Sequence, residues 1–385
     1  MKLLFVIHAF DIGGITSAFR NMIGEVSYKS DAKINILVFS DKLGNVVFPS
    51  NVNSIKSPRL LNIFFSKKEN LSLPYKLLWY ILQGMGRLTG DSHMWPILKP
   101  HAKLPLSYDV AISFENNIPS TGTDLFVNKF VLENVNASSR IAFIHNDPHK
   151  LGFTKEYVEK EYATFDKLIC VSKSCANKLE SIAPSISSKI NVVYNFNNVN
   201  YRVIKLESRS NKSILNIVTV CRLNNEQKRI DRIIEACKIL KDKGVCFKWD
   251  IYGTGPDLSY LEQYARKINV LDKLTFKGYT DKAIEVISNY DLFVLASDYE
   301  AYGLVLKEAL IAKVPVISTN FEEAYEVLKD KFNSYIVEKE PESLSNAIST
   351  LALNREKIDK MRQYIIDNPE TNNVAYEQLK NILNL

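Results

Sequence analysis

Cysteine is scarce in this sequence and is not arranged for metal binding or disulfide pairing. The 385 residues include five cysteines, an odd number. No two of them form a CxxC pair, and most fall within predicted strands or helix faces: Cys170, Cys175, Cys221, Cys237 and Cys246. Structural zinc sites use paired cysteines, and disulfide scaffolds use many of them. We therefore expect buried, reduced thiols in a cytoplasmic protein, and no metal site.

Long apolar runs are also missing. No uninterrupted apolar stretch approaches the roughly 20 residues of a membrane-spanning helix. The first residues, MKLLFVIHAF, resemble a signal peptide, but only Leu3 to Ile7 are continuously apolar. This is shorter than the roughly 7 to 15 residues that a signal peptide requires. The sequence contains no solenoid-type repeat and no low-complexity tract. Its length, 46% apolar content and 24% charged content predict a globular protein of about two domains.

The most informative stretch runs from Asn289 to Ser318. An apolar run, Leu292 to Leu295, is followed by a polar turn and then by Glu300 and Glu308, with seven residues between the two glutamates. Apolar spacing predicts a helix that begins between them and ends near Lys313, because Pro315 disfavours helical geometry in the residue before it. Val314 to Ile317 then reads as a buried strand. The order strand, turn, helix, strand is one unit of a parallel α/β sheet, and its turn lies at the edge where ligands bind.

These two glutamates have two interpretations. Glu300 could simply favour the helix dipole while Glu308 faces water. Alternatively, both acids hold ligand hydroxyls, and the amides of Ala301, Tyr302 and Gly303 meet an anion. The pair does not suit a glycosidase, because two helical residues at this spacing would lie roughly 12 Å apart.

The whole chain alternates strands and helices. In the first half, strands are predicted at Lys2 to His8, Ile34 to Phe39, Asp109 to Ser113, Arg140 to His145 and Lys167 to Val171, with a helix capped by Thr16 or Ser17 and running to about Val26, and with Ser172 as a later cap. Asn195 to Asn211 reads as a linker. In the second half, Ile214 to Val220 and Phe247 to Tyr252 are predicted strands flanking a helix. This pattern predicts an α/β fold with two Rossmann-like domains facing across a cleft.

Two further clusters are candidate phosphate sites. Gly13 and Gly14 follow the first strand, where they could form a turn with positive φ or let a phosphate approach a helix start. In VTVCRLNNEQKRIDRIIEA, Arg222 follows a strand and Lys228 precedes a helix. These cations could be solvated surface charges, or they could converge on one anion at the sheet edge.

Together these motifs resemble the retaining glycosyltransferases of family 4, which have the two-domain GT-B architecture. EAYGLVLKEAL is similar to the family's Glu-x7-Glu motif, and CRL with Lys228 is similar to its GRL…K motif, with Cys221 in place of glycine. The resemblance implies that Glu300 contacts the donor sugar, that Glu308 contacts the ribose, and that Arg222 and Lys228 bind the diphosphate. It also implies that the Gly13–Gly14 pair and the segment from Ala301 to Leu304 approach the donor.

The same resemblance assigns roles to three weaker motifs. Gly253 in DIYGTGP, and Tyr279 with Thr280 after TFKG, would line the nucleotide pocket. His145 in IHND would reach the donor sugar, although a histidine at a strand end is more often a structural hydrogen bonder; Asp147 would touch the acceptor. The implied domains are an acceptor-binding domain at 1–200, a donor-binding domain at 201–370, and a helix at 371–385 that crosses back to the first domain.

The function implied is transfer of a hexose from a nucleotide sugar, with UDP expected as the nucleotide, to a saccharide acceptor in bacterial capsule or related polysaccharide synthesis. No cofactor or metal is expected, since cations and amides would neutralise the leaving diphosphate. A sugar-nucleotide epimerase of GT-B-like architecture and a nicotinamide-dependent oxidoreductase are the alternatives; the missing GxGxxG disfavours the latter. The net charge of +6 comes without a nucleic-acid recognition motif, so no nucleic-acid partner is expected.

The segment from Ser54 to Leu104 has eight basic and two acidic residues, a balance that equals the net charge of the whole chain. Apolar and aromatic residues alternate with these charges: Ile63, Phe64, Phe65, Leu77, Leu78, Trp79, Tyr80, Ile81, Leu82 and Trp95. The segment could be a helical insertion that packs on the first domain. It could instead rest on an anionic bilayer, which would suit a lipid-linked acceptor and a peripheral position at the inner face of the plasma membrane.

Overall fold

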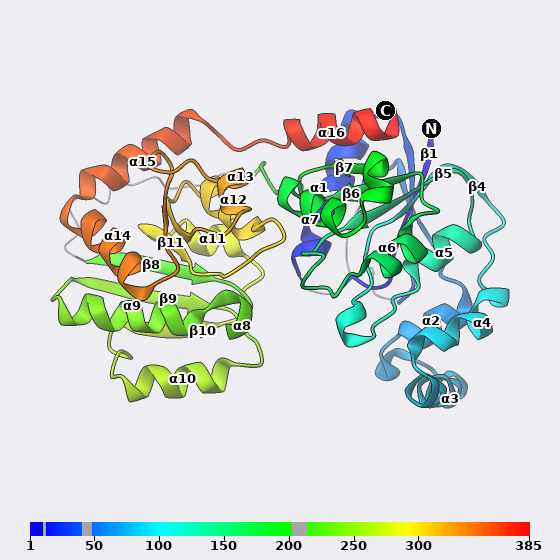
Figure 1. The fold of residues 1–385 in the computed structure, drawn as a ribbon, viewed down its shortest axis with the longest axis horizontal. Helices are drawn as coiled ribbons and strands as arrows, with labels where there is room; N and C mark the ends of the chain where they lie inside the picture. The colour runs from blue at the N-terminus through cyan, green and yellow to red at the C-terminus, as the bar shows by residue number, and fades with distance from the viewer. Residues whose placement is uncertain (11–12, 41–47, 202–213) are drawn as a thin grey trace. The chain divides into compact units, whose positions relative to one another are not determined.

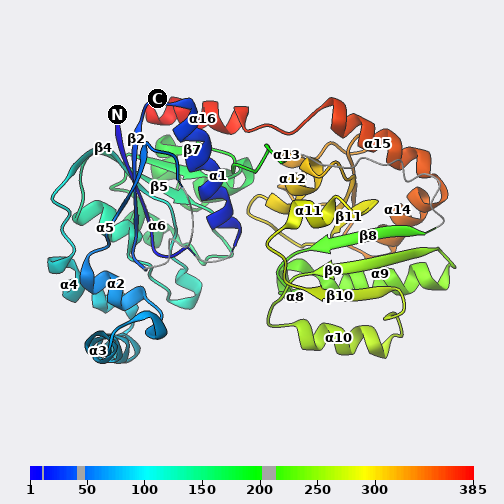
Figure 2. The same ribbon diagram turned by 180° about the vertical axis from the view of Figure 1, so that it is seen from behind.

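The computed structural model describes residues 1–10, 13–40, 48–201 and 214–385. These residues form two compact units, one of Met1–Phe196 with Asn372–Leu385 and one of Asn197–Thr371. In each unit, helices cover both faces of a parallel sheet (Figures 1 and 2). The predicted α/β class is confirmed. Part of the predicted glycine turn, residues 11–12, and part of the predicted linker, residues 202–211, lie outside the described residues.

The first unit contains a sheet of seven strands in the order β3-β2-β1-β4-β5-β6-β7. The strands are β1 Lys2–Ile7, β2 Lys33–Val38, β3 Val52–Ile55, β4 Ser107–Ser113, β5 Asn136–Ile144, β6 Lys167–Cys170 and β7 Ile190–Val192. Its helices are α1 Gly14–Lys29, α2 Arg59–Phe65, α3 Leu73–Thr89, α4 Trp95–Leu98, α5 Val127–Glu133, α6 Lys155–Tyr162, α7 Lys173–Ile182 and α16 Asn373–Leu383. The strand order reverses between β1 and β4, and ligands of open α/β sheets bind where the order reverses.

Helix α1 begins earlier than its sequence predicts. The carbonyl of Gly13 accepts the first helical hydrogen bond from the Ser17 amide at 3.1 Å, so Thr16 and Ser17 already lie in the first turn. The predicted cap at Thr16 or Ser17 is therefore wrong. Gly13 is extended, with φ 170° and ψ 173°, and Gly14 is the first helical residue, so neither adopts the left-handed turn conformation suggested for the pair. Ser172, by contrast, caps α7 as predicted, because its Oγ accepts from the Cys175 amide at 3.0 Å.

The last helix, α16, belongs to the first unit although it closes the sequence. The Tyr376 hydroxyl donates to the carbonyl of Lys29 at 2.9 Å, and the Lys167 ammonium donates to the carbonyl of Ile382 at 2.7 Å. The apolar side of α16 packs against the same core as α1. The chain therefore returns to the first sheet after completing the second.

The segment from Ser54 to Leu104 forms α2, α3, α4 and short connecting turns on the first unit. Ile63, Phe64, Leu82 and Trp95 are buried in the core, which confirms that the insertion packs on this unit. The indole of Trp79 donates to the carbonyl of Ser66 at 3.1 Å. These residues therefore cannot belong to an exposed aromatic surface. The apolar side chains that remain exposed form a different set, along α3.

The second unit contains six strands in the order β10-β9-β8-β11-β12-β13. They are β8 Leu215–Val220, β9 Phe247–Tyr252, β10 Leu274–Gly278, β11 Leu292–Leu295, β12 Val316–Thr319 and β13 Ser334–Val337. The helices are α8 Asn225–Lys228, α9 Ile230–Asp242, α10 Leu258–Lys267, α11 Ala283–Ile287, α12 Leu304–Ile311, α13 Ala324–Val327, α14 Pro341–Leu353 and α15 Arg355–Asp367. Here the order reverses between β8 and β11, the strands that lead to Arg222 and Glu300.

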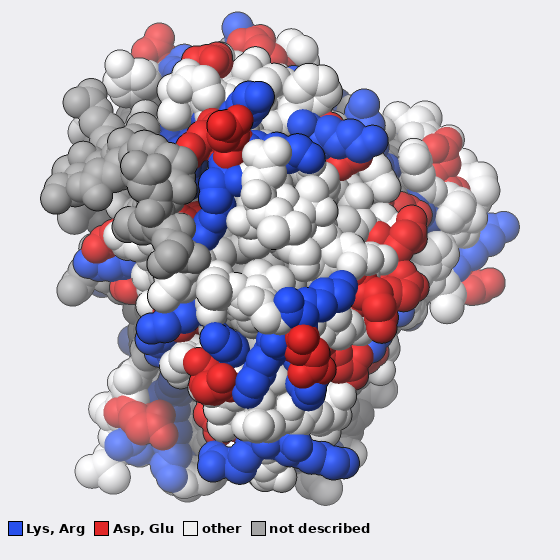
Figure 3. All heavy atoms as spheres, turned by 90° about the vertical axis from the view of Figure 1, so that its left-hand side faces the viewer, with Lys and Arg blue, Asp and Glu red and all other residues white. Residues whose placement is uncertain are grey.

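The predictions made from cysteine content and from the absence of long apolar runs agree in part with the structure. Cys170, Cys175 and Cys237 are buried, but Cys246 is exposed, so the expectation of buried thiols is wrong for that residue. No helix in the described part of the chain has the length and apolar character of a membrane span. On the face that Figure 3 shows, basic and acidic side chains are interspersed.

Candidate active site

The candidate site of the second unit lies at the carboxyl ends of β8 and β11. These strands are parallel neighbours, with Ile217 opposite Leu292. Arg222 follows β8, and the loop of residues 296–300 follows β11, so the order reversal brings the basic and the acidic segments to one edge. The predicted helix between the glutamates is confirmed as α12, whereas the following strand begins at Val316, two residues later than predicted.

Lys228 and Glu300 form an ion pair across this edge, with only 13% and 8% of their side chains exposed. Glu300 also accepts from the Ser297 hydroxyl at 2.6 Å and from the Gln227 amide at 3.4 Å. Lys228 is therefore not a solvated surface charge. Arg222 differs, because its exposed side chain makes no hydrogen bond or ion pair with any described residue. Of the two predicted phosphate-binding cations, Lys228 is held by Glu300, and Arg222 is available to a ligand.

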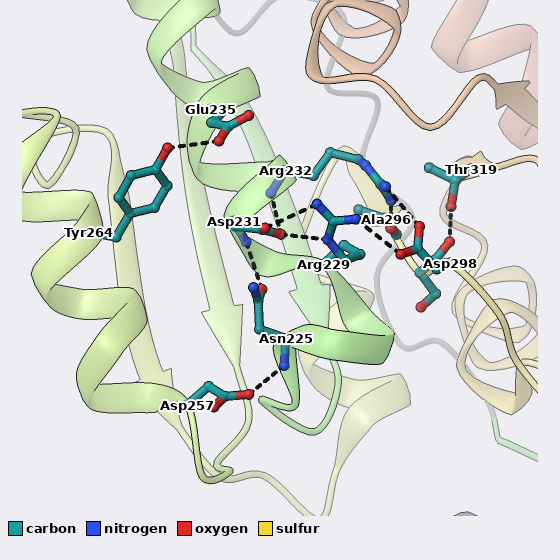
Figure 4. Close-up of polar contacts among 11 residues, drawn as sticks. Asn225, Arg229, Asp231, Arg232, Glu235, Asp257, Tyr264, Ala296, Asp298 and Thr319 are labelled. Atoms are coloured by element: carbon teal, nitrogen blue, oxygen red, sulfur yellow. Dashed lines mark hydrogen bonds and ion pairs between the residues drawn. The ribbon is translucent and has the colours of Figure 1, made fainter. Parts of the chain in front are cut away.

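A second set of ion pairs clamps the two loops together (Figure 4). The carboxylate of Asp298 accepts from Arg232 Nη2 at 2.8 Å and from Arg229 Nη1 at 3.1 Å. Arg232, almost fully buried, also donates to the carbonyl of Ala296 at 2.5 Å. Burial alone would raise the pKa of Asp298, but the hydrogen bonds from the two arginines lower it below its ordinary value. The clamp thus fixes the loop that carries Glu300 relative to the helix start beside Lys228.

Arg229 takes part in this clamp because of an unusual backbone. It has φ 49° and ψ 54°, a left-handed conformation that ends α8 and begins α9. Its guanidinium is fixed by Asp231 through two contacts at 3.0 and 3.1 Å. The amide of Asp231 is in turn held by Asn225 Oδ1 at 2.9 Å. The turn between the helices is therefore supported by side chains that also reach the acidic loop.

The start of α12 presents backbone amides to the same edge. Gly303 precedes the helix with φ 74°, a conformation that side chains rarely adopt, and an added Cβ would lie 3.0 Å from Leu306 Cδ1. The amides of Ala301, Gly303 and Leu304 donate no hydrogen bond to another described residue. Such amides at a helix start favour an anion. The left-handed backbone at position 303 favours glycine. This is a second reason for glycine here, besides the predicted role of giving a ligand close access.

Glu308 lies one helical turn into α12 and does not face water freely. The residue is half-buried, and its carboxylate has no hydrogen-bond or ion-pair partner among the described residues. Burial raises the pKa of this carboxyl group from 4.5 to about 7. The suggestion that Glu308 is a solvated helix residue is therefore wrong. A half-buried carboxylate without a partner among the described residues suits a ligand that brings hydroxyl donors.

The raised pKa of Glu308 predicts a pH-dependent cost in stability. Because the folded-state pKa is above the unfolded value, stability falls as the pH rises from about 4.5 through 7, and the full penalty is present above pH 7. We expect Glu308→Gln to raise the free energy of unfolding by about 1 to 3 kcal/mol at pH 8 and by much less at pH 5. Urea unfolding at both values measures this, with exposed Glu262→Gln as the control. Equal effects at the two pH values would show that the ionised carboxylate carries no penalty.

The glycine turns beside this edge have a packing role. An added Cβ at Gly253 would lie 1.8 Å from the carbonyl oxygen of Cys221, and one at Gly255 would lie 2.2 Å from that of Leu223. The loops after β8 and β9 therefore touch through backbone atoms. Tyr279 follows β10 with an exposed ring, and Thr280 accepts from the Lys282 amide at 3.1 Å. The contribution of these residues to a ligand pocket stays a prediction.

His145, in the first unit, is the other unusual candidate. It follows β5, is almost fully buried, and packs against Phe114 and Phe143 with ring centroids 4.5 and 5.4 Å away. Neither ring nitrogen forms a hydrogen bond with a described residue, although the nearby backbone of Phe114 slightly favours the charged form. Burial lowers the pKa of His145 to about 3, so its ring is neutral at physiological pH. A structural role and a contact to the donor sugar both stay predictions for this residue.

Unlike that of His145, the side chain of Asp147 has polar partners, and the glycine pair of the first unit is exposed. The Asp147 carboxylate accepts from the His149 amide at 2.9 Å and pairs with the Lys178 ammonium at 2.9 Å, so it stabilises its own turn. The exposed backbone of Gly13 has open space where a side chain would be. Among the described residues, no group of histidine, cysteine, aspartate and glutamate side chains is arranged to hold a metal ion.

Part of the chain matches a known protein family, and the whole chain superposes on solved structures. Residues 204–368 match the family model of glycosyl transferases group 1, which covers the site of the second unit. The crystal structure of a TarM mutant from S. aureus in complex with Fondaparinux, alpha-GlcNAc-glycerol and UDP superposes with a TM-score of 0.70 at 14% identity, covering 100% of both chains. The chain therefore has the GT-B fold, and its second unit matches the group 1 glycosyl transferases.

Curated relatives of the chain match over shorter stretches. A poly(ribitol-phosphate) alpha-N-acetylglucosaminyltransferase of Staphylococcus aureus (strain COL) is 28% identical over 165 residues, which are 41% of this chain and 33% of that protein. The putative colanic acid biosynthesis glycosyltransferase WcaL of Escherichia coli (strain K12) is 28% identical over 147 residues, 36% of each chain. The chain thus spans about a third of the length of these relatives.

Sequence reasoning missed the clamp formed by Arg229, Arg232 and Asp298. Arg229 and Arg232 are three residues apart at the start of a helix, a spacing that places both on one side. Asp298 stands two residues before Glu300. This spacing could have indicated a pair of guanidinium groups with an acidic partner. Nothing in the sequence indicated that the partner lies after β11.

Proposed function

We propose that this glycosyltransferase moves a hexose from a UDP-sugar to a saccharide acceptor, with retention of anomeric configuration, in the synthesis of a bacterial surface polysaccharide such as capsule. The contact between Lys228 and Glu300 carries this proposal, because it joins the basic and acidic motifs at the edge where the strand order reverses. UDP is present in the TarM structure, and the names of the curated relatives refer to poly(ribitol-phosphate) and to colanic acid biosynthesis.

The chemistry requires charge stabilisation. The bond between the anomeric carbon and the phosphate oxygen breaks, its electron pair stays on the diphosphate, and the acceptor oxygen bonds to the anomeric carbon. The acceptor loses its proton, which the diphosphate can take. Arg222, Lys228 and the amides at the start of α12 would stabilise the negative charge that develops on the diphosphate. These cations remove the need for a metal ion in the proposed reaction.

Two acids would hold the rest of the donor. Glu300, which pairs with Lys228, would accept hydrogen bonds from hydroxyls of the sugar. Glu308, which lacks a partner among the described residues, would accept the ribose hydroxyls. From the first unit, the neutral ring of His145 would bond to the sugar, and the open backbone at Gly13 and Gly14 would allow the diphosphate to approach. Gly253, Tyr279 and Thr280 would border the uracil ring.

We also propose that the acceptor is lipid-linked and that the enzyme works at the inner face of the plasma membrane. The excess of basic residues between Ser54 and Leu104 supports this, since anionic headgroups attract such a segment. A lipid-linked acceptor would remain in the bilayer while its saccharide end enters the active site.

A donor panel tests the proposed reaction. Purified protein is incubated with UDP- and GDP-sugars, with and without octyl glycosides as acceptors, and released nucleoside diphosphate and glycoside products are measured. We expect UDP release that increases with acceptor, together with a product whose anomeric configuration matches that of the donor. Conversion of the UDP-sugar to an isomer without acceptor would indicate the epimerase alternative. Reduction of a nicotinamide cofactor would indicate the oxidoreductase alternative.

The clamp predicts an effect on turnover without direct contact to the donor. Asp298→Asn removes the charge that holds Arg229 and Arg232, so the Glu300 loop should be positioned less well. We expect a roughly 10- to 100-fold lower kcat with a donor KM within about threefold of wild type, because misplacement reduces catalysis more than binding. The control is Asp242→Asn, which breaks the exposed pair with Lys238 on α9. A change in melting temperature alone, with normal kcat, would limit the clamp to stability.

A further inference from the structure

Helix α3 of the first unit exposes a row of large apolar side chains. Leu73, Leu77 and Leu88 are 84%, 66% and 88% exposed, and Tyr80 and Ile81 are each 51% exposed. We call these five residues the outer stripe. Their spacing of three, four and seven positions places them on one side of the helix. The stripe therefore extends along the whole length of α3.

The opposite side of α3 attaches the helix firmly to the unit. Leu82 is buried, the indole of Trp79 donates to the carbonyl of Ser66, and the amide of Gln83 donates to the carbonyl of Phe64 at 2.9 Å. Figures 1 and 2 show α3 at the outer end of the first unit, beyond α2. The helix is thus fixed on one side, and its outer stripe has no cover within the unit.

Such a row needs an explanation. Single exposed apolar residues are normal in proteins, but contiguous apolar patches mark interaction sites. Other strongly exposed apolar residues of the first and second units, such as Tyr28, Tyr325 and Leu353, lie on separate elements. Only α3, among the described helices, combines five such residues on one side.

The charges around the stripe indicate its partner. Helix α3 contains Lys76 and Arg87 and no acidic residue. At the angle between successive helical residues, both basic residues fall beside Tyr80 along one border of the stripe. Just before the helix, Lys67 is exposed and the ammonium of Lys68 lies 4.7 Å from the centre of the Tyr80 ring. A narrow apolar stripe bordered by cations suits the headgroup layer of an anionic bilayer.

We propose that α3 docks on an anionic membrane, with the outer stripe lying in the headgroup layer and with Lys67, Lys76 and Arg87 facing lipid phosphates. The helix lies in the plane of the interface and does not cross the bilayer, since its opposite side is occupied by Leu82 and Trp79. This inference narrows the surface from the whole segment between Ser54 and Leu104 to one helix. The docking itself does not depend on the proposed reaction. Only its purpose, to bring the enzyme to a lipid-linked acceptor, rests on the proposed function.

Vesicle flotation tests the docking without any sugar nucleotide, so its result is independent of the donor panel. The full-length protein is mixed with vesicles of phosphatidylglycerol and phosphatidylcholine, or of phosphatidylcholine alone, at low and high salt. We expect at least tenfold more protein on the anionic vesicles at low salt, and its release at high salt. A variant with Leu73→Gln, Leu77→Gln and Leu88→Gln should bind these vesicles at least tenfold less, because it lacks the apolar side chains that enter the headgroup layer. Its fold should be unchanged, because the three positions are exposed.

Two comparisons make the outcome specific. A matched variant with Tyr28→Gln and Leu353→Gln removes side chains of similar exposure, 88% and 89%, and should float like wild type. Charge reversal at Lys67, Lys68 and Lys76 should abolish the preference for anionic lipid. Normal flotation of the Leu73, Leu77 and Leu88 variant would overturn the proposal. A wild-type dimer that becomes a monomer in that variant, with no vesicle binding, would instead assign the stripe to a second copy of the chain.

Discussion

Glu300→Gln should abolish sugar transfer while leaving the affinity for UDP nearly intact. In the structure, the Glu300 carboxylate lies in the acidic loop, accepts from Ser297 and pairs with Lys228. The proposed contact of Glu300 is to the sugar, which UDP lacks. Glutamine keeps the shape of the side chain but cannot neutralise Lys228, so the ammonium becomes available to phosphate. The variant should therefore bind UDP at least as well as wild type.

The matching variant is Glu308→Ala. The Glu308 carboxylate has no partner among the described residues, so its removal leaves no other side chain uncompensated. We expect weaker binding of UDP itself, by roughly 10-fold or more, because two ribose hydroxyls lose a charged acceptor. Calorimetric titration of both variants with UDP measures the difference. Equal losses of UDP affinity would contradict the separate roles of the two acids.

The second large effect is expected at the cations. Arg222→Ala and Lys228→Ala should each lower turnover by roughly 100- to 1000-fold, the scale for removing one preorganised donor from a developing oxyanion. Arg222 is exposed and makes no polar contact with a described residue, so its loss should leave the fold unchanged. Lys228→Ala also leaves Glu300 without its ion-pair partner, and we expect some loss of stability in addition.

Turnover of the two variants is measured at saturating donor, with circular dichroism as a check of the fold. Lys238→Ala is the control, because Lys238 is an exposed cation paired with Asp242 within α9. Wild-type turnover in a folded Arg222→Ala variant would return Arg222 to the class of surface charges. The same result for Lys228→Ala would limit that residue to holding Glu300.

The sequence could predict the strands and their edge because apolar runs and turn residues are local signals. The strands leading to His145, Arg222 and Glu300 are found within a few residues of their predicted positions. Strand order cannot be read so directly, but parallel strands place their carboxyl ends on one side, and this sufficed to group the basic and acidic motifs. The helix start at Gly13 was misplaced because a glycine carbonyl can accept the first bond without a side-chain cap.

Other features depend on contacts between distant segments. The partner of Arg232 is Asp298, 66 residues away, and no periodicity connects them. Gly253 reads as a turn residue, but its main constraint is the carbonyl of Cys221 in a neighbouring loop. In the segment between Ser54 and Leu104, composition showed many apolar residues but not which side of each helix is covered. Trp95 is buried, whereas Leu73 and Leu88 stand exposed.

The central claim, that the edge of the second unit binds the donor nucleotide with its ribose on Glu308, is tested most directly by one binding cycle. The dissociation constants of UDP and of 2′,3′-dideoxy-UDP are measured for wild type and for Glu308→Ala. We predict that loss of the ribose hydroxyls weakens binding to wild type by about 10-fold or more and makes little further difference in Glu308→Ala, because both changes remove the same contact. Equal losses in the two proteins would contradict the account.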